Sequence, residues 1–369
     1  MRCRFLLTVG LAFTAMLRLE AQANNITTFL RVEKIPGLNF GLAFSETNDK
    51  GFIGTGQDDG TGGHGMCDLY VMKVDECGAT QWYYRYGGPD EEGGKFVRQT
   101  SNGGYIIAGL ARSWGAGNYD AWLVRLNPQG QLQWSRTFGT GNDDFGLATD
   151  ETPDGGFLMG GFWGSPRTGF ILKTNAAGTP LWQRNVGLSN AWVNYVEALP
   201  GGDIFIAGQY SGPYGGQDVF AARLNSLGNP IWTRSYGMAG NDGIDWDLAG
   251  KVTPNGDLII SATTSSMGQG NDLMLMRLAG ATGVLQWARV MQGAGDDRSH
   301  FVNYTSNNLI LQSGYTTTWG NGGADVLFNV YDASGNRLWS KTYGSNSLDK
   351  GWGIQETQDG GFLVSASTQ

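Results

Sequence analysis

A repeat of about 51 residues, marked by tryptophan, is the feature that most restricts how this chain can fold. Six tryptophans occupy equivalent places in it: Trp82, Trp134, Trp182, Trp232, Trp287 and Trp339. Positions 82 and 339 enclose five intervals, so the spacing averages about 51 residues. A fixed period of this length is typical of propellers and solenoids, in which each unit packs mainly against its neighbours.

Each unit contains four short apolar runs separated by turn or loop sequences. In one unit the runs cover 105–108, 121–126, 133–139 and 144–148, and a glycine-rich loop ending in Asp120 precedes the second run. Four strands of about five residues with four turns fill the period. A tandemly repeated four-stranded unit of this size predicts the blade of a β-propeller.

Counting the turns before the first run of each unit predicts seven blades. These turns lie near Gly51, Gly103, Gly155, Gly201, Gly256, Asn308 and Gly360. Segments 29–34 and 40–43 are predicted to supply the third and fourth strands of a closing blade whose first strand is 362–366. The sequence thus predicts an all-β, seven-bladed propeller of four-stranded antiparallel blades. Strands from both termini would close the ring, which removes an exposed sheet edge.

The sequence ends at Gln369, before the second strand of the predicted closing blade. Either that blade has three strands, or the sequence is a fragment of a longer protein that carries a further domain.

Composition excludes the main competing classes. Glycine accounts for 60 of 369 residues, and 12% of the residues are aromatic. A helical bundle would lose roughly 1 kcal/mol for each interior glycine. A collagen-like chain needs glycine at every third position, and a disordered chain contains few aromatic residues. An all-β fold of many short strands joined by tight turns accounts for both the high glycine content and the high aromatic content.

The first 23 residues have the features of a secretory signal peptide. Arg2 and Arg4 precede a mostly apolar run at 5–17, and Ala21-Gln22-Ala23 supplies small residues around a cleavage site. The apolar run is shorter than the roughly 20 residues of a transmembrane helix. A buried first helix is the alternative interpretation. We expect residues 24–369 to form a single propeller domain, secreted to the extracellular space or the outer cell surface of a bacterium.

Charge and cysteine content restrict the partners. The formal net charge of −8 argues against nucleic-acid binding, which needs clustered Lys and Arg. No later segment is long and apolar enough for a membrane span, and we expect a monomeric propeller. Cys67 and Cys77 flank one extended run, which would hold them too far apart to form a disulfide bond with each other. No role is assigned to either.

The repeat units resemble a known group of propellers. They follow the order Asp-Gly-Gly-Phe, then Asp-x-apolar-apolar, then Gly-x-x-x-Trp-x-Lys/Arg-x-Tyr-Gly. This pattern resembles bacterial seven-bladed propeller repeats of secreted and surface proteins, especially Bacteroidetes-like ones. Gly130-x-x-x-Trp134 and Gly335-x-x-x-Trp339 are also similar to the tryptophan-docking motif of quinoprotein propellers. The first resemblance implies a surface protein, often followed by a secretion-sorting domain.

The tryptophans and the basic residues that follow them have a structural interpretation. We expect the tryptophans to fill the gaps between blades. The basic residue two places later is expected to be structural as well, at Arg136, Arg184, Arg234, Arg289 and Lys341.

Two sets of acidic residues recur on one rim of the predicted ring. One set precedes the second run of every complete unit but the third, at Asp68, Asp120, Asp218, Asp272 and Asp325. The other follows the Tyr-Gly pair, at Glu92, Asp144, Asp242, Asp297 and Asp349. Carboxylates at fixed turn positions favour capping of backbone N–H groups. Calcium is the alternative, with Asp242, Asp245 and Asp247 as its densest candidates.

Bulky side chains precede glycine on the same rim: Trp114, Trp163, Tyr214, Met267 and Trp319. Flat apolar rings beside hydrogen-bonding groups suit sugars. We therefore predict ligand binding at Trp114, Trp163, Tyr214 and Trp319 with Asp144, Asp242 and Asp297. The alternative is that these rings fold back over their own loops.

Signals for catalysis are weak. His64 and His300 lie in different blades, and no zinc-ligand spacing or phosphate-binding loop occurs. Loops on the opposite rim, such as 127–130 and 332–335, are short and uniform, whereas catalytic residues usually sit on specialised loops. The sequence favours a non-catalytic module that binds a glycan or a protein and needs no cofactor. The alternatives are a carbohydrate-active enzyme with a carboxylate pair (a glycoside hydrolase or lyase), a quinoprotein-like oxidoreductase, and a spacer.

Overall fold

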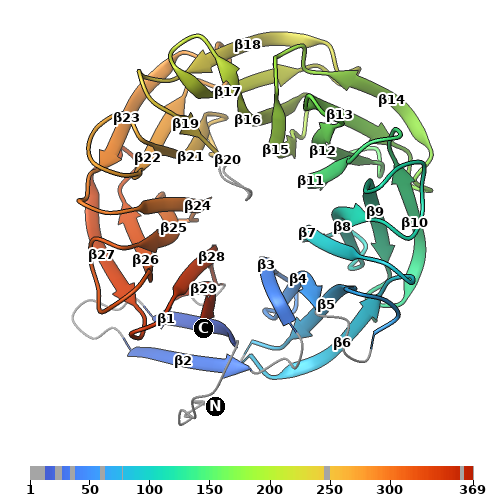
Figure 1. The fold of residues 1–369 in the computed structure, drawn as a ribbon, viewed down its shortest axis with the longest axis horizontal. Helices are drawn as coiled ribbons and strands as arrows, with labels where there is room; N and C mark the ends of the chain where they lie inside the picture. Colours follow the sequence, from blue (N-terminus) through green and yellow to red (C-terminus); the bar gives the residue numbers. More distant parts are fainter. Residues whose placement is uncertain are drawn as a thin grey trace.

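A computed structural model describes residues 13–20, 27–33, 38–58, 63–76, 78–244, 250–357 and 361–368 of the chain. Seven antiparallel sheets are arranged around a central opening, and the described residues contain no helix (Figure 1). The prediction of an all-β propeller with seven four-stranded blades is confirmed.

The first four blades follow one another along the chain. Blade one consists of β3 (Leu38–Glu46), β4 (Phe52–Asp58), β5 (Leu69–Val74) and β6 (Thr80–Tyr86). Blade two consists of β7 (Glu92–Gln99), β8 (Tyr105–Ala111), β9 (Asp120–Leu126) and β10 (Leu132–Phe138). Blade three consists of β11 (Phe145–Glu151), β12 (Phe157–Trp163), β13 (Thr168–Thr174) and β14 (Pro180–Asn185). Blade four consists of β15 (Trp192–Ala198), β16 (Ile204–Gly212), β17 (Gly216–Leu224) and β18 (Pro230–Tyr236).

The last three blades include two departures from this order. Blade five consists of β19 (Asp242–Gly243), β20 (Gly250–Val252), β21 (Leu258–Thr264), β22 (Asp272–Leu278) and β23 (Leu285–Met291), and both β19 and β20 pair with β21. Blade six consists of β24 (Asp297–Tyr304), β25 (Ile310–Thr316), β26 (Asp325–Tyr331) and β27 (Arg337–Tyr343). Blade seven takes β28 (Asp349–Glu356) and β29 (Gly361–Thr368) from one end of the chain and β1 (Phe13–Glu20) and β2 (Thr27–Glu33) from the other.

The strand pairing corrects the predicted blade boundary by one strand. Segment 144–148 was expected to end a blade, but the strand that contains it, β11, pairs with the following strand β12 and begins blade three. A tight turn at 152–156 joins β11 to β12, so hairpin pairing is the direct outcome. The tryptophan-bearing strand is therefore outermost, and the loop after it crosses to the inner strand of the next blade.

The predicted composition of the seventh blade is shifted by one strand in the same way. Segment 40–43 lies in β3, the inner strand of blade one, and not in the closing blade. Segment 29–34 falls largely in β2, the outermost strand of blade seven. The strand that the sequence did not account for is β1, which pairs with both β29 and β2 and lies within the predicted signal peptide. The predicted cleavage site at 21–23 lies outside the described residues.

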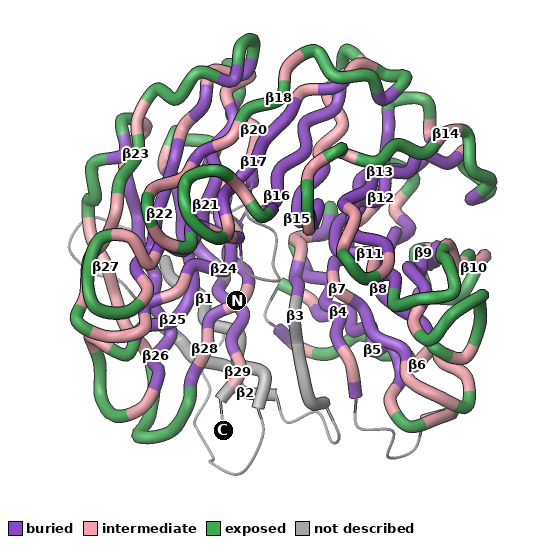
Figure 2. Tube along the Cα trace, turned by 45° about the horizontal axis from the view of Figure 1, so that its top comes forward, coloured by how far each residue is buried: buried purple, intermediate pink, exposed green. Residues whose placement is uncertain are grey.

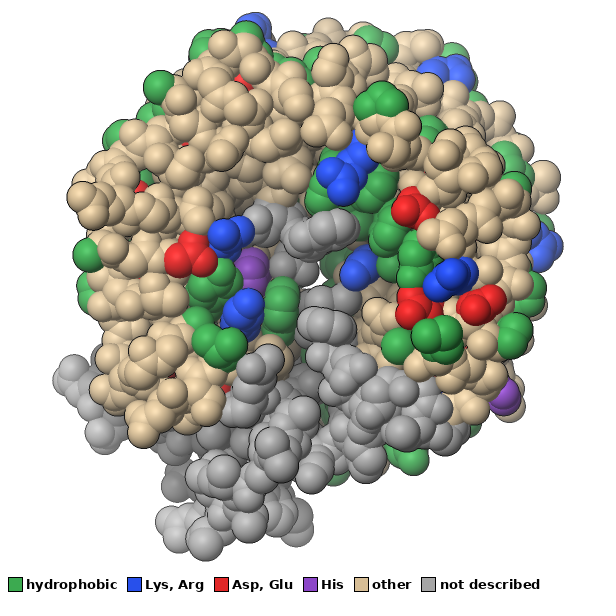
Figure 3. Space-filling model, in the orientation of Figure 1, with side chains coloured by type: hydrophobic (Ala, Val, Ile, Leu, Met, Phe, Trp, Pro, Cys, Tyr) green, Lys and Arg blue, Asp and Glu red, His purple; other side chains and the backbone are tan. Residues whose placement is uncertain are grey.

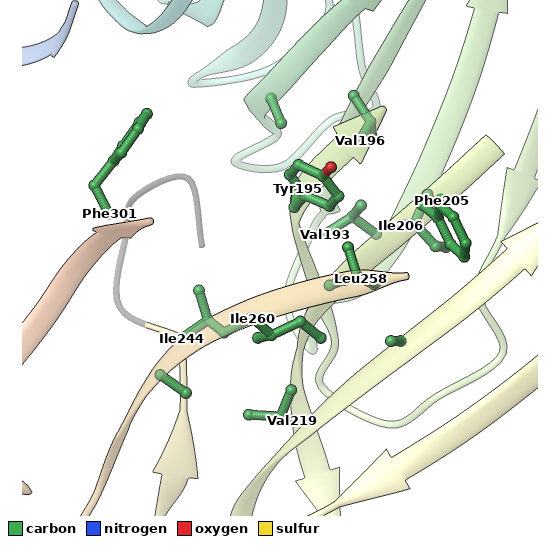
Figure 4. Close-up of a cluster of buried hydrophobic side chains, with 14 of the residues drawn as sticks. Val193, Tyr195, Val196, Phe205, Ile206, Val219, Ile244, Leu258, Ile260 and Phe301 are labelled. Carbon is green, nitrogen blue, oxygen red and sulfur yellow. The ribbon is translucent and has the colours of Figure 1, made fainter. Parts of the chain in front are cut away.

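Burial follows position within the blade. The two middle strands of blade two, β8 and β9, are buried along their whole length, while most of the outermost strand β10 is not (Figure 2). Middle strands are covered on both faces because a blade stands between two others. Figure 4 shows such a junction, where side chains from β15, β16, β17, β21 and β24 meet.

Each repeated tryptophan contacts the following blade, which confirms its predicted structural role. The indole Nε1 of Trp182 donates to the Ser226 carbonyl at 3.2 Å, and that of Trp232 donates to the Gly280 carbonyl at 3.0 Å. The ring of Trp182 covers Gly228, which has φ of 77° and where a Cβ atom would lie 2.8 Å from the indole. Glycine is favoured there for both its conformation and its size. Three of the basic residues lie over the ring of the tryptophan that precedes them: Arg136, Arg184 and Arg289.

Candidate functional site

The first set of rim acids closes its own loops. Asp120 is buried, and its Oδ2 accepts hydrogen bonds from the backbone N–H groups of Ala116 and Gly117 at 3.1 and 3.2 Å. Asp325 accepts one from Asn321 N at 2.9 Å. These contacts agree with the capping interpretation, because a buried carboxylate needs such donors.

The second set joins each crossing loop to its own blade. Asp144, Asp242 and Asp297 are fully buried. Asp144 accepts hydrogen bonds from Thr140 N and, at 2.7 Å, from Gly164 N. Asp297 accepts hydrogen bonds from the Thr316 hydroxyl and Thr317 N at 2.6 and 3.1 Å. This geometry supports a structural role for all three, and their predicted contact with a ligand stays a prediction.

Members of the two sets approach each other at the blade junctions. A Cβ atom on Gly139 would lie 2.0 Å from Asp120 Oδ1 and 2.7 Å from Asp144 Oδ2, so the two carboxylates flank this glycine. Burial raises the pKa of Asp325 above its ordinary value, and the charge of Asp349 raises it further. Among the described residues, no group of three or more His, Cys, Asp or Glu side chains is arranged to hold a metal ion. Asp245 and Asp247 lie outside the described residues.

The predicted aromatic residues lie in four different blades and do not meet in one site. Trp163 is buried and stacks on Phe170 with ring centroids 3.5 Å apart, so it folds back onto its own blade. Trp114 is 45% exposed and packs against Trp122, and Tyr214 is 51% exposed. Trp319 is half-buried and lines two cavities.

We call those two cavities the Trp319 groove. Their volumes are about 420 and 540 Å³, and they share Met291, Trp319 and Arg337, so they form one depression on the outer wall between blades five and six. Gln292 and Asn336 contribute amide groups to it. Trp319, one of the aromatic residues predicted from sequence to bind a ligand, thus lines a cavity.

β-Bulges in two inner strands bring a histidine and a tryptophan together at a second candidate site. His300 and Trp352 occupy register shifts in β24 and β28, and their rings stack with centroids 4.6 Å apart. Bulges re-aim side chains and are frequent near functional sites. The His300 Nδ1–H donates to the Gly351 carbonyl at 2.7 Å. Figure 3 shows charged side chains gathered beside the central opening, on a face that is otherwise mostly uncharged.

The charge state of His300 yields a pH prediction. Burial lowers its pKa to about 4, and the nearby charges of Lys350 and Arg298 add to this, although Asp296 opposes them. An unfolded histidine has a pKa of about 6.5. Between pH 6.5 and 4 the unfolded chain therefore binds a proton that the folded protein does not. Stability should fall with decreasing pH across this window, by up to about 1.4 kcal/mol per pH unit.

Replacing His300 by glutamine should remove that part of the pH dependence while keeping a donor for Gly351. The measurement is the unfolding free energy at pH 7, 5.5 and 4.5. His64→Gln is the control, because His64 is exposed and lies in another blade. An unchanged slope in His300→Gln would contradict the assignment.

Sequence reasoning missed a ring of polar residues at the far ends of the inner strands. Each blade contributes one residue, near the end of its inner strand, and this residue occupies the same position in the pairing with the second strand of that blade. The seven residues are Ser45, Arg98, Asp150, Glu197, Lys251, Asn303 and Gln355. We call these seven residues the polar ring. They recur about every 52 residues, but no two are of the same type. The regular spacing of these positions was the only sequence signal for the polar ring, because the residue types differ.

Most members of the polar ring bind the next blade. The Ser45 hydroxyl donates to the Val97 carbonyl at 2.8 Å, and Arg98 Nη1 donates to Asp150 at 2.5 Å. Asp150 accepts from Ala198 N at 2.8 Å. Glu197, Asn303 and Gln355 likewise bond to Val252 N, the Ile354 carbonyl and Glu46 N. The polar ring thus links successive inner strands through side chains.

A cavity of about 210 Å³ lies against the polar ring. Its lining comes from the inner strands or adjacent turns of blades one, two, five, six and seven, so it lies on the axis of the ring. Asn48, in the turn between β3 and β4, also lines it, so the cavity lies toward the rim of short, uniform loops, where the sequence offered no candidate residues. The inner strands, rather than specialised loops, supply its chemistry. We call it the axial cavity.

Comparison with known proteins gives information on the fold. No protein-family model matches the sequence, and no curated protein is detectably similar to it. The WD40 domain of Neurospora crassa Pan2 superposes with a TM-score of 0.54 at 12% identity, over 90% of this chain and 89% of that domain. A protein of unknown function from Bacteroides caccae gives 0.48 at 11% identity, over 90% and 94% of the two chains. At these identities the likeness shows the propeller fold alone.

The quinohemoprotein alcohol dehydrogenase from Comamonas testosteroni is a more distant structural neighbour. It gives a TM-score of 0.46 at 11% identity, and the match covers 81% of this chain and 65% of the dehydrogenase. The Bacteroidetes-like type and the kinship of the tryptophan repeats stay predictions. The described residues include no helix that is long and apolar enough to cross a membrane.

Proposed function

We propose that this protein is a non-catalytic binding module of the cell exterior, and that it binds a glycan in the Trp319 groove. The observation that carries the proposal is the groove itself. A half-buried indole lies between two contiguous cavities on the outer wall of the propeller, with amide and guanidinium groups around it.

The groove has the chemistry that a sugar requires. The indole of Trp319 offers a flat apolar surface against the C–H face of a sugar ring. Gln292, Asn336 and Arg337 can donate hydrogen bonds to hydroxyl groups, and Gln292 and Asn336 can also accept them. A few polar groups around an apolar surface are typical of ligand sites.

The lining residues favour binding over hydrolysis. Glycoside hydrolysis generally uses a pair of Asp or Glu side chains beside the scissile bond. The residues that line the Trp319 groove include Arg289, Arg337 and Lys341 and no carboxylate. The rim carboxylates described above are engaged with backbone N–H groups of their own or neighbouring loops.

Replacing Trp319 by alanine tests the proposal. Loss of a central aromatic contact should lower glycan affinity at least about tenfold. The measurement is binding of the purified protein to a glycan array, followed by titration of the best sugar. Tyr214→Ala is the matched control, because Tyr214 is an exposed aromatic residue on another blade.

Binding that survives Trp319→Ala, or that is lost equally in Tyr214→Ala, would contradict the assignment to this groove. The absence of any array signal would contradict the glycan as ligand and leave a protein partner as the alternative.

Export is the second part of the proposal. Residues 1–23 have the pattern of a signal peptide, and cleavage after Ala23 would remove β1 from the middle of the seventh sheet. The edge of β29 would then be open to pairing with another strand. N-terminal sequencing of the exported protein distinguishes a mature start at Asn24 from a retained β1.

A further inference from the structure

We propose that the axial cavity is a second binding site, specific for a small organic carboxylate held by Lys251 and Arg98. This site is separate from the Trp319 groove, so each can be tested without the other. The described residues that line it include two cations and one carboxylate, although the whole chain carries a net charge of −8. The remaining lining residues are apolar or carry amide or hydroxyl groups.

Lys251 is the first reason for the assignment. The other six members of the polar ring each bond to a group of the next blade, whereas the described contacts of Lys251 are with Glu197 of the preceding blade. Its Nζ lies 3.7 Å from Glu197 Oε1, which is longer than a hydrogen bond. Glu197 Oε2 accepts hydrogen bonds from Tyr195 and Val252 N, and Lys251 faces the other oxygen, Oε1. An ammonium group has three N–H donors, so a single acceptor at this distance leaves donors for a ligand.

Arg98 is the second reason. A guanidinium group has five N–H donors. Asp150 accepts from Nη1, and the guanidinium lies 5.7 Å from the Phe96 ring centroid. Nη2 and Nε have no partner among the contacts described. Because the Arg98 side chain is 25% exposed and lines the cavity, these donors are within reach of a bound carboxylate. Planar donors of this kind match a carboxylate well.

The side-chain amide of Gln355 adds hydrogen-bond donors to the cavity. Gln355 uses its Oε1 to accept from Glu46 N at 3.1 Å, which leaves its Nε2 as a donor. Asn303 uses both ends of its amide, because Oδ1 accepts from Tyr304 N at 2.8 Å and Nδ2 donates to the Ile354 carbonyl at 3.2 Å. Glu46, the one carboxylate among the described lining residues, has interactions of its own. The donors that remain for a ligand lie on Lys251, Arg98 and Gln355, and they select an acceptor-rich anion.

Size and charge narrow the ligand further. A volume of about 210 Å³ equals several water molecules of roughly 30 Å³ each, so the ligand is small. Asp150 and Glu197 lie just behind the two cations, and they would repel a dianion such as phosphate. Phe96, Phe301 and Val302 offer an apolar wall for a short carbon skeleton. These features together fit a monocarboxylate, such as a hydroxy acid.

The test is calorimetric titration of the full chain with lactate and with propane-1,2-diol, which has the same skeleton without the charge. Lactate should bind with one-to-one stoichiometry and at least tenfold more tightly than the diol. Lys251→Gln should weaken lactate binding at least tenfold. Lys50→Gln is the matched control, because Lys50 lies on the same rim outside the cavity and should leave affinity unchanged.

Three results would overturn the proposal: no lactate binding at millimolar concentration, equal binding of the diol, or tighter binding of inorganic phosphate. Unchanged lactate affinity in a folded Lys251→Gln protein would also overturn it. If that variant does not fold, lactate soaked into crystals of the unaltered protein decides the question. Density for its carboxylate beside Lys251 and Arg98 supports the site, and density elsewhere or none contradicts it.

Discussion

A Gly208→Ala variant is expected to unfold with a free energy lower by about 3 kcal/mol, the upper part of the usual range for overpacking. A Cβ atom at this position would lie 1.8 Å from the carbonyl oxygen of Trp192 and 2.8 Å from the ring of Phe220. The first obstacle is the backbone of the inner strand β15, just before its bulge, and a backbone cannot rotate away as a side chain can. The substitution should therefore shift β15 itself.

The matched control is Gly201→Ala. Gly201 has open space around the position of a Cβ atom, so alanine there should be neutral or slightly stabilising. Denaturant unfolding of both variants is the measurement. Gly161 and Gly314 hold the same position in other blades, 1.8 and 1.9 Å from inner-strand carbonyls, and should behave like Gly208. A loss below about 0.5 kcal/mol at Gly208 would show that the inner strand yields easily.

Replacing Arg98 by methionine should lower the unfolding free energy by about 3–5 kcal/mol, because it leaves a buried charge without its partner. The Asp150 side chain is 7% exposed and lies 2.5 Å from Arg98. Burial alone would lower the pKa of Arg98, but the charges of Asp150 and Glu197 raise it above its ordinary value. The guanidinium group is therefore charged at any working pH.

The double variant Arg98→Met/Asp150→Leu separates charge from packing. It should recover most of the lost stability, because paired apolar side chains can replace a buried ion pair at little cost. Arg298→Met is the control, since its ion pair with Asp296 is more than one-third exposed and contributes at most about 1 kcal/mol. Equal losses in Arg98→Met and Arg298→Met would contradict the special role of the polar ring.

The repeat made most of the fold predictable, and it also explains the main error. Segment 144–148 follows the tryptophan strand and precedes β12, and the sequence order is the same whether it ends one blade or begins the next. Loop length does not distinguish the two blade assignments, because the loop 139–144 between blades is about as short as the turns within a blade. Only the hydrogen bonds of β11 to β12 fix the boundary.

The candidate sites were less predictable, for a different physical reason. Trp319 was found because aromatic residues recur at its position, but Trp163 recurs there too and is buried against Phe170. Exposure depends on neighbouring loops that one sequence does not place. The polar ring was missed because its seven positions share their spacing of about 52 residues but no residue type. A Ser, an Arg and a Gln at equivalent positions give no repeated letter to notice.

The contact between each tryptophan and the following blade has a direction. Trp182 reaches forward to Ser226, and Trp232 reaches forward to Gly280. Each of blades one to six thus gives a tryptophan on one flank, and each of blades two to seven receives one. Such an interface is heterologous, and copies joined through it add head to tail until a circle closes. If the chain were cut in the loops between blades, each fragment would end in one tryptophan-donating face and one tryptophan-accepting face. Two such fragments would then have complementary faces through which to associate.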